Sequence, residues 1–87
     1  MEEPLHEVCI KILRRMYNQH LIGGKHQPEV YYLKKIQYYP REEQKMIHKQ
    51  WTKLIQEQWI LIKQKPTERH ISLNPEKLGD IRRSIGL

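Results

Sequence analysis

At 87 residues the chain is long enough for one domain with a small hydrophobic core, and we expect residues 1–87 to form a single unit. It carries 16 lysine and arginine residues against 10 aspartate and glutamate residues, a formal charge of +6. This excess favours a polyanionic partner, which is nucleic acid, an anionic membrane surface or an acidic protein, although a basic surface can also serve only to prevent self-association.

The single cysteine and the lack of a long apolar run exclude several classes of protein. Cys9 alone cannot form an intramolecular disulfide or supply the two cysteine ligands that many zinc sites need. Its spacing from Leu5, Val8 and Ile12 predicts a core residue rather than a nucleophile. The longest apolar run, Trp59 to Ile62, is too short to cross a membrane, and the start MEEP is unlike a signal peptide. We therefore expect a cytoplasmic protein in a reducing compartment, with no membrane partner.

A first helix is predicted from Pro4, which suits an opening helical turn, to Asn18 or Gln19. Residues 1–3 are expected to fray. Apolar residues recur every three or four positions and form one stripe of the helix: Leu5, Val8, Cys9, Ile12, Leu13 and Met16. After it, Leu21 and Ile22 predict a short extended piece that a pair of glycines ends.

A second, shorter helix is predicted to open at Pro28, with Gln27 as a weak cap and Glu29 near the positive end of the helix. The inward stripe of this helix is narrow: Val30, Leu33 and Ile36. Nearer to solvent we expect Lys34, Lys35, Tyr31 and Tyr32. The helix is predicted to end at Tyr38, Tyr39 and Pro40, because a proline disfavours helical geometry in the residue before it.

The third helix is predicted to begin at Pro40 or Arg41 and to continue to Gln58. At about 100° per residue its side chains separate into two arcs. The inner arc contains Ile47, Trp51, Leu54, Ile55 and the stem of Gln58. The outer arc contains Arg41, Lys45, Lys49, Thr52, Lys53 and Gln56, with His48 at its border. Most of the acidic residues of the helix fall in its first turn, at Glu42 and Glu43, where they suit the helix dipole.

A β-hairpin and a last helix are predicted to complete the chain. Trp59 to Lys63 and His70 to Leu73 predict two strands, and Gln64 to Arg69, which contains a proline, predicts the hairpin tip between them. Three basic residues lie on or beside that tip: Lys63, Lys65 and Arg69. Asn74 and Pro75 then form a strong helix start. The apolar stripe of the last helix is Leu78, Ile81 and Ile85, and the helix is expected to end at Gly86.

The predicted order is helix, short extended piece, helix, helix, strand, turn, strand, helix. This order is typical of a winged helix-turn-helix domain, an α+β fold with a three-helix core, a small antiparallel β wing and a C-terminal helix. In that fold the second and third helices form the turn unit. Leu21 and Ile22 would form the short first strand, which completes a three-stranded sheet with the wing.

The chain also resembles the small uncharacterised winged-helix proteins found in archaea. The resemblance is carried by LIGGKH at 21–26, by HISLNPEKL at 70–78, and by the leucine-bearing second and lysine-spaced third helices, and it spans about 10 to 85. The family pattern has threonine before the proline of the second helix and glycine between the third helix and the strand. This chain has Gln27 and Gln58 there, so a cap is weakened and a residue other than glycine must turn the corner. The resemblance implies the fold and a DNA-binding role.

We predict that the chain binds double-stranded DNA as a transcription regulator or chromatin-associated factor. The helix at 41–58 would enter the major groove, with Arg41, Lys45, Thr52 or Gln56 at base edges and Lys49 and Lys53 at phosphates. His48, at the border of the outer arc, is also predicted to contact the nucleic acid. The wing at 63–70 would grip the adjacent backbone through Lys63, Lys65 and Arg69. The amphipathic terminal helices are a candidate homodimer contact.

Three alternatives stay open at this point. A protein interaction module of the same fold would not bind nucleic acid directly, because fold does not settle function. RNA is another candidate partner, and the outer arc of the third helix is also compatible with an ordinary solvated surface.

The residues do not favour catalysis. No HExxH motif, paired-carboxylate site or Ser/His/Asp arrangement is visible. Five histidines share no ligand spacing: His6, His20, His26, His48 and His70. His20 and His26 flank one loop and could meet, but two ligands without a third do not make a metal site. We therefore predict no enzymatic activity, no cofactor and no metal.

Overall fold

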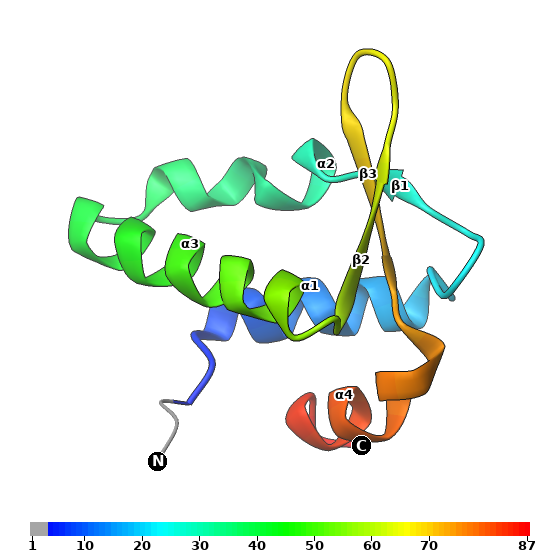
Figure 1. Ribbon diagram of the computed structural model, residues 1–87. Coiled ribbons are helices and arrows are strands. Elements are labelled where there is room, and N and C mark those ends of the chain that lie inside the picture. Colours follow the sequence, from blue (N-terminus) through cyan, green and yellow to red (C-terminus); the bar gives the residue numbers. More distant parts are fainter. Residues whose placement is uncertain (1–3) are drawn as a thin grey trace.

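The computed structural model describes residues 4–87, so the predicted fraying of residues 1–3 lies outside the described residues. In chain order the elements are α1 (Glu7–Asn18), β1 (Gln27–Pro28), α2 (Val30–Leu33), the 3-10 helix η1 (Lys34–Tyr38), α3 (Arg41–Gln56), β2 (Ile60–Gln64), β3 (Arg69–Leu73), the 3-10 helix η2 (Pro75–Lys77) and α4 (Leu78–Ser84) (Figure 1). Across the described residues the protein is α+β, as predicted, with four α-helices and a three-stranded antiparallel sheet.

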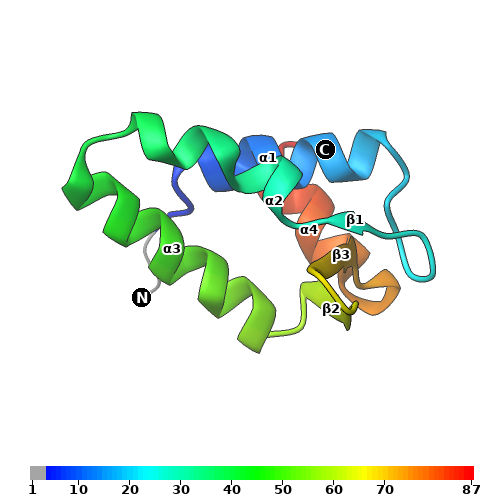
Figure 2. The same cartoon turned by 90° about the horizontal axis from the view of Figure 1, so that it is seen from above.

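The helices α1, α2–η1 and α3 form one cluster, from which the β2–β3 hairpin projects (Figure 1). Seen from above, α1 and α2 run along one edge of the molecule and α3 runs along the other (Figure 2). The core between them takes side chains from all the helices and from the sheet, and its fully buried members include Leu13, Ile36, Ile47, Ile71 and Ile81. Burial of this apolar surface is what holds the helices against the sheet.

Helix α1 begins at Glu7 and ends at Asn18, so its predicted end is confirmed and its predicted start is wrong. Pro4 lies before the helix, because His6 is the N-cap and its Nδ1 accepts a hydrogen bond from the backbone N–H of Val8 at 3.1 Å. The predicted apolar stripe is buried from Val8 onward. Cys9 is fully buried, as predicted for a core residue, and burial raises the pKa of its thiol to about 11.

The first strand lies at Gln27–Pro28 and not at Leu21 and Ile22. In the sheet order β1-β3-β2 it is an edge strand, where the missing N–H of proline does little harm. Ile22 makes only an isolated parallel bridge with Leu73. Pro28 therefore does not open a helix, and Gln27 is a strand residue rather than a cap.

Helix α2 begins at Val30, two residues later than predicted, and passes into η1 after four residues. The inward face of this segment differs from the predicted one. Val30 is 51% exposed although it was predicted to point inward, and Tyr32 is 6% exposed although it was predicted to lie nearer solvent. A 3-10 helix places residues i and i+3 on one face. Accordingly Leu33 is partly buried and Ile36 is buried.

Helix α3 begins at Arg41, as predicted, and ends at Gln56, two residues earlier than predicted. The turn that follows has the hydrogen bonds of a Schellman motif, from the N–H of Trp59 to the carbonyl of Leu54 and from the N–H of Gln58 to that of Ile55. Gln58 occupies the left-handed position of this motif, with φ of 63°. Its side chain is exposed, so the prediction that its stem packs in the core is wrong.

The start of the last helical segment is confirmed. The side chain of Asn74 accepts a hydrogen bond from the N–H of Glu76 at 3.0 Å and donates one to the carbonyl of Gln58 at 2.7 Å. Pro75 then opens η2, which leads into α4. Asn74 therefore both starts this helix and fixes the corner after α3.

Candidate nucleic-acid interface

The outward face of α3 carries the predicted nucleic-acid-binding residues in one continuous surface. All seven of those in the helix are exposed: Arg41, Lys45, His48, Lys49, Thr52, Lys53 and Gln56. The four cations recur every four residues, so they form a row with about 6 Å of rise between neighbours. The helix has 16 residues and is about 24 Å long at 1.5 Å per residue.

Acidic residues stand only at the ends of this helix. Glu42 and Glu43 occupy its first turn, and Glu57 follows its last residue. From residue 44 to residue 56 the sequence contains no acidic residue. Lys53 Nζ lies 3.9 Å from a carboxylate oxygen of Glu57, an exposed pair one turn apart. The middle of the outward face therefore presents positive and neutral polar groups together.

Two polar side chains fix the inner face of α3 to the rest of the protein. Trp51 Nε1 donates a hydrogen bond to Glu29 Oε2 at 2.8 Å. Gln50 receives a hydrogen bond from the backbone N–H of His6 at 2.6 Å and donates one to the carbonyl of Pro4 at 3.1 Å. Since each contact joins α3 to a segment far away in the sequence, the helix is held in a defined rotation about its axis.

Glu29 also anchors the base of the hairpin. Arg69 donates two hydrogen bonds to it, from Nε to Oε1 at 2.7 Å and from Nη2 to Oε2 at 2.8 Å. Burial alone would raise the pKa of Glu29, but the hydrogen bonds from Arg69 and Trp51 and the charge of Arg69 outweigh it and hold that pKa below its ordinary value. The guanidinium of Arg69, predicted to grip a DNA backbone, is thus engaged in a bidentate internal salt bridge.

The other two predicted hairpin residues are Lys63 and Lys65. Lys63 stands opposite His70 in the β2–β3 register, one residue away from Arg69. Because successive side chains of a strand point to opposite faces, Lys63 lies on the face away from Arg69, and Lys65 follows the end of β2. Close to them, His26 Nδ1 is 2.8 Å from His70 Nδ1. Burial and the positive charges of Lys65, His70 and Lys63 lower the pKa of His26.

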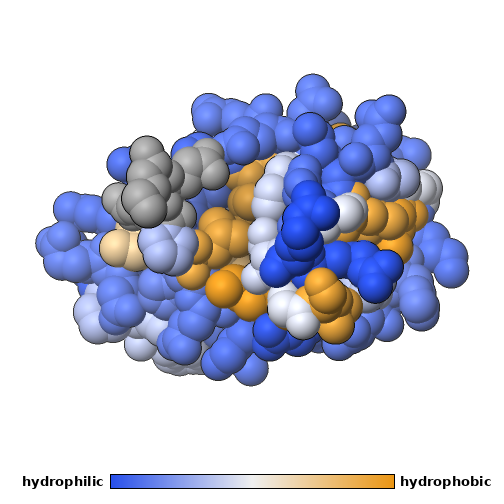
Figure 3. All heavy atoms as spheres, turned by 90° about the horizontal axis from the view of Figure 1, so that it is seen from below, coloured by the Kyte–Doolittle hydropathy of each residue, from blue (hydrophilic) through white to orange (hydrophobic). Residues whose placement is uncertain are grey.

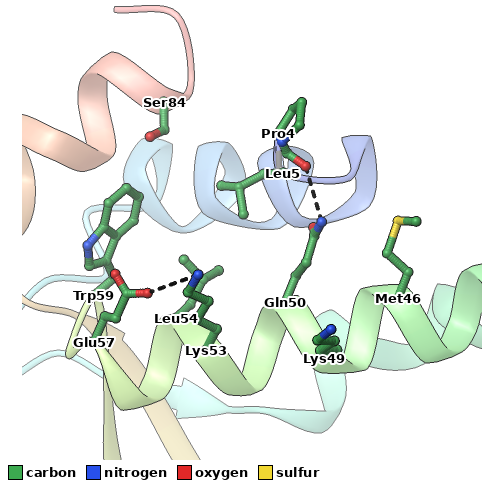
Figure 4. A pocket seen from close by; sticks show the side chains of 10 residues that line it. All are labelled: Pro4, Leu5, Met46, Lys49, Gln50, Lys53, Leu54, Glu57, Trp59 and Ser84. Atoms are coloured by element: carbon green, nitrogen blue, oxygen red, sulfur yellow. Dashed lines mark hydrogen bonds and ion pairs between the residues drawn. The ribbon is translucent and has the colours of Figure 1, made fainter. Parts of the chain in front are cut away.

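A hollow of about 590 Å³ borders the outward face of α3 (Figure 4). Residues from α3, the N-terminal segment, the corner after α3 and the end of α4 line it: Pro4, Leu5, Met46, Lys49, Gln50, Lys53, Leu54, Glu57, Trp59 and Ser84. Figure 4 shows that Lys49 and Lys53 belong to α3 and that the bond from Gln50 to Pro4 crosses the hollow. Lys49 and Lys53 thus mark the edge of the outward face, and Lys45, Thr52 and Gln56 lie nearer its middle.

The structure pairs two histidines that are distant in the sequence. The sequence left open that His26 could meet His20 across one loop; in the structure His26 contacts His70. Among residues 4–87 no group of three or more histidine, cysteine, aspartate or glutamate side chains is placed to hold a metal ion. None of the helices in this range has both the length and the apolar character needed to span a membrane.

Sequence reasoning missed two residues that position the candidate interface. Glu29 was interpreted only as an acid near a helix start, and Gln50 was not singled out at all. Both act through partners more than 20 residues away, such as Trp51 and Arg69 for Glu29 and Pro4 for Gln50. A glutamine on the inner side of an amphipathic helix was the only local signal for Gln50.

The face that carries α4 bears on the predicted homodimer. Seen from below, its hydrophobic surface lies in patches that are separated by more hydrophilic residues (Figure 3). The last residue, Leu87, is 62% exposed. Arg83 pairs with Asp80 on the exposed side of α4. A dimer contact through the terminal helices stays a prediction.

The chain was compared with protein-family models, with curated proteins and with solved structures, and none of these comparisons found a significant match.

Proposed function

We propose that this chain is a winged helix-turn-helix protein that binds double-stranded DNA, with α3 in the major groove and the β2–β3 hairpin as the wing. The order of helices and strands and the sheet order β1-β3-β2 support this fold. The resemblance of residues 21–26 and 70–78 to small archaeal winged-helix proteins points in the same direction. A role in transcription regulation or chromatin organisation is part of the proposal.

The observation that carries the proposal is the outward face of α3. It combines a row of exposed cations with exposed Thr52 and Gln56, and no acidic residue stands between positions 44 and 56. An α-helix with its side chains is about 10–12 Å across, and the major groove is about 12 Å wide. A helix of this charge and size therefore suits the groove.

The proposed roles follow from position on the helix. Arg41, Lys45, Thr52 and Gln56 would reach base edges, because arginine, lysine and glutamine pair with guanine and adenine edges in the major groove. Lys49 and Lys53, at the edge of the face, would meet phosphates. In the wing, Lys63 and Lys65 would contact the neighbouring backbone. Arg69 would act chiefly by holding the wing against α2 and α3.

Fluorescence anisotropy titrations with unrelated DNA duplexes at several salt concentrations test the proposal. Contacts to phosphates release counterions, so log K is expected to fall with log salt by about 0.9 for each phosphate neutralised. A flat dependence, or no binding at low salt, would refute DNA binding and favour the alternative, an interaction module that binds protein.

A charge-reversal pair locates the interface. Lys45→Glu with Lys49→Glu is expected to weaken binding at least tenfold and to lower the salt slope by about one, because of the two lysines only Lys49 is assigned to a phosphate. The free energy of unfolding should change by less than about 1 kcal/mol. The control, Lys25→Glu with Arg82→Glu, makes the same change of net charge at exposed positions outside α3 and the hairpin. Equal losses in the two variants would show a nonspecific charge effect rather than a site on α3.

A further inference from the structure

Exposed aromatic and apolar side chains gather on the α2–η1 segment. Val30 is 51% exposed, Tyr31 53% and Tyr38 79%. Within residues 4–87 only two other large hydrophobic residues are exposed, Met46 and Leu87. Single exposed hydrophobic residues are ordinary, but a group on one short segment is typical of a binding surface.

These tyrosines border a groove of about 590 Å³ between α1 and the α2–η1 segment. Its floor is apolar and includes Val8 and Ile12 from α1, each of which is 6% exposed. The groove is lined by ten residues, none of them acidic: Val8, Lys11, Ile12, Arg15, Tyr31, Tyr32, Lys34, Lys35, Tyr38 and Tyr39. The combination of an apolar floor with cationic walls defines what the groove can accept.

The cations come in two pairs, one from α1 and one from η1. Lys11 and Arg15 are four residues apart on α1, so they share one face of that helix. Lys34 and Lys35 lie across from them on η1. From Val8 to Arg15 the wall extends about 10 Å along the α1 axis, at 1.5 Å per residue, which matches two turns of a helix.

Internal contacts keep the walls apart and in place. The hydroxyl of Tyr32 donates a hydrogen bond to Gln19 Oε1 at 2.6 Å and so joins α2 to the C-cap of α1. The guanidinium of Arg15 lies 5.2 Å from the centre of the Tyr32 ring, and Lys34 Nζ lies 5.5 Å from the centre of the Tyr31 ring. These cation–π contacts hold positive charge beside the apolar floor. The groove is therefore preformed, which lowers the entropic cost of binding.

We propose that this groove binds an acidic, amphipathic helical segment of a partner protein. Aliphatic or aromatic side chains at helical spacing on the partner helix would cover Val8 and Ile12. Carboxylates on both flanks of that helix would meet the two pairs of cations, Lys11 with Arg15 and Lys34 with Lys35. The charge of the walls excludes a basic segment. Single-stranded nucleic acid fits less well, because Lys34 already lies over the exposed Tyr31 ring and the Tyr32 ring is buried, so neither is open for a base to stack on.

The groove is independent of the proposed DNA interface. None of its lining residues comes from α3 or from the hairpin. Seen from above, α3 lies at one side of the helical cluster, and α1 with α2 forms the other (Figure 2). The inference therefore goes beyond DNA binding and stands or falls separately: a partner could occupy the groove while α3 contacts DNA.

A designed peptide tests the groove. The probe is a fluorescein-labelled peptide of about 14 residues, or about four helical turns, with leucine and tryptophan at spacings of three and four and glutamate on both flanks. A scrambled peptide of the same composition lacks the apolar stripe. We expect the designed peptide to bind at least about tenfold more tightly than the scrambled one, a difference of about 1.4 kcal/mol. Amide NMR shifts are expected to change in residues 8–15 and 31–39.

Variants then separate the groove from general charge attraction. Lys11→Glu with Lys35→Glu reverses one cation on each wall and is expected to weaken peptide binding at least about tenfold, by about 1.4 kcal/mol. Lys25→Glu with Arg82→Glu, which changes net charge equally away from the groove, is expected to bind the peptide as the unmodified protein does. Tyr38→Ala, a change at an exposed ring, tests the apolar contribution with little risk to folding.

Three results would overturn the inference: no preference for the designed peptide, equal weakening in the two charge variants, or NMR shifts confined to residues outside the groove. A single-stranded oligonucleotide is the competing probe. If it binds, and if Lys11→Glu with Lys35→Glu and Tyr38→Ala abolish that binding while leaving peptide binding unchanged, the groove is a nucleic-acid site and the proposal is wrong.

Discussion

Replacing Glu29 with alanine removes three hydrogen bonds at once, one from Trp51 Nε1 and two from Arg69. The three groups belong to different elements: Glu29 is the residue before α2, Trp51 is in α3, and Arg69 begins β3. The substitution therefore separates the base of the hairpin from the inner face of α3 without touching any residue of the outward face.

The expected cost is about 2 kcal/mol. Trp51 is 3% exposed, so its indole N–H loses its acceptor in a buried place, which costs roughly 1–3 kcal/mol. The side chain of Arg69 is 43% exposed, and solvent screening limits the contribution of its ion pair to less than about 1 kcal/mol. For a domain of this size 2 kcal/mol lowers the melting temperature by about 10 °C. Urea and thermal unfolding measure both quantities.

The pH dependence has a definite sign. Since the folded protein holds the pKa of Glu29 below its ordinary value, the ionised carboxylate contributes stability above the unfolded pKa of about 4.3, and this stability is lost as pH falls through the lower, folded pKa. The difference between the unmodified protein and Glu29→Ala should therefore shrink in that acidic range. Glu57→Ala is the control, because it removes a carboxylate from an exposed pair and is expected to cost less than about 0.5 kcal/mol. A loss in Glu29→Ala no larger than in this control would refute the reasoning.

Three further predictions concern single sites. Gln58→Gly is expected to stabilise the protein by about 1 kcal/mol in urea unfolding, because a φ of 63° strains a residue that has a side chain. A destabilised variant would contradict the left-handed backbone conformation of residue 58. At pH 8 the thiol of Cys9, whose pKa burial raises to about 11, should react with a thiol reagent far more slowly in native than in urea-unfolded protein, and equal rates would disprove its burial. In an NMR titration the midpoint of His26 should lie below about 6.5, because burial, Lys65, His70 and Lys63 lower its pKa. The midpoint should rise in His70→Gln, and an unchanged midpoint would mean that the two rings do not interact.

Elements with strong local signals could be predicted from the sequence. A proline before Arg41, acids in the first turn and a long amphipathic pattern define α3 within the chain itself, so its start was placed correctly. Asn74 and Pro75 form a cap whose hydrogen bond reaches only two residues along the chain. In such cases the residues that decide the structure are neighbours in sequence, and periodicity and capping rules are sufficient.

The first strand and the phase of the second helix could not be predicted in this way. Pro28 and Glu29 look like a helix start, but the backbone there pairs with β3, more than 40 residues away. This pairing delays α2 by two residues. The segment also changes to 3-10 geometry after Leu33. Val30, the first residue of α2, is exposed, and Tyr32 is buried, with its hydroxyl donating to Gln19 at the end of α1. A single period of 3.6 residues across the whole segment cannot represent these two changes.

The residues of the candidate site differ in the same way: some could be placed from the sequence and others could not. The exposed row on α3 follows from helical spacing alone, because each member is placed by its own helix. The separation of Arg69 from Lys63 depends on strand register and on the distant carboxylate of Glu29. The three hairpin cations are close in sequence and were therefore predicted to act together. The alternation of side chains along the strands places Lys63 and Arg69 on opposite faces of the sheet.

The polar contacts of α3 also determine how its outward face can be tested. Among residues 4–87 no buried side-chain nitrogen or oxygen lacks a hydrogen-bond partner. On α3 the buried polar side chains are Gln50 and Trp51, and both make their hydrogen bonds on the inner side of the helix. Lys45 and Lys49 make none of the hydrogen bonds and ion pairs found among the described residues, and exposed charges contribute little to folding. A loss of DNA binding on reversal of Lys45 and Lys49 therefore reports on the interface, whereas any loss caused by Glu29→Ala must act through the position of α3 relative to the hairpin.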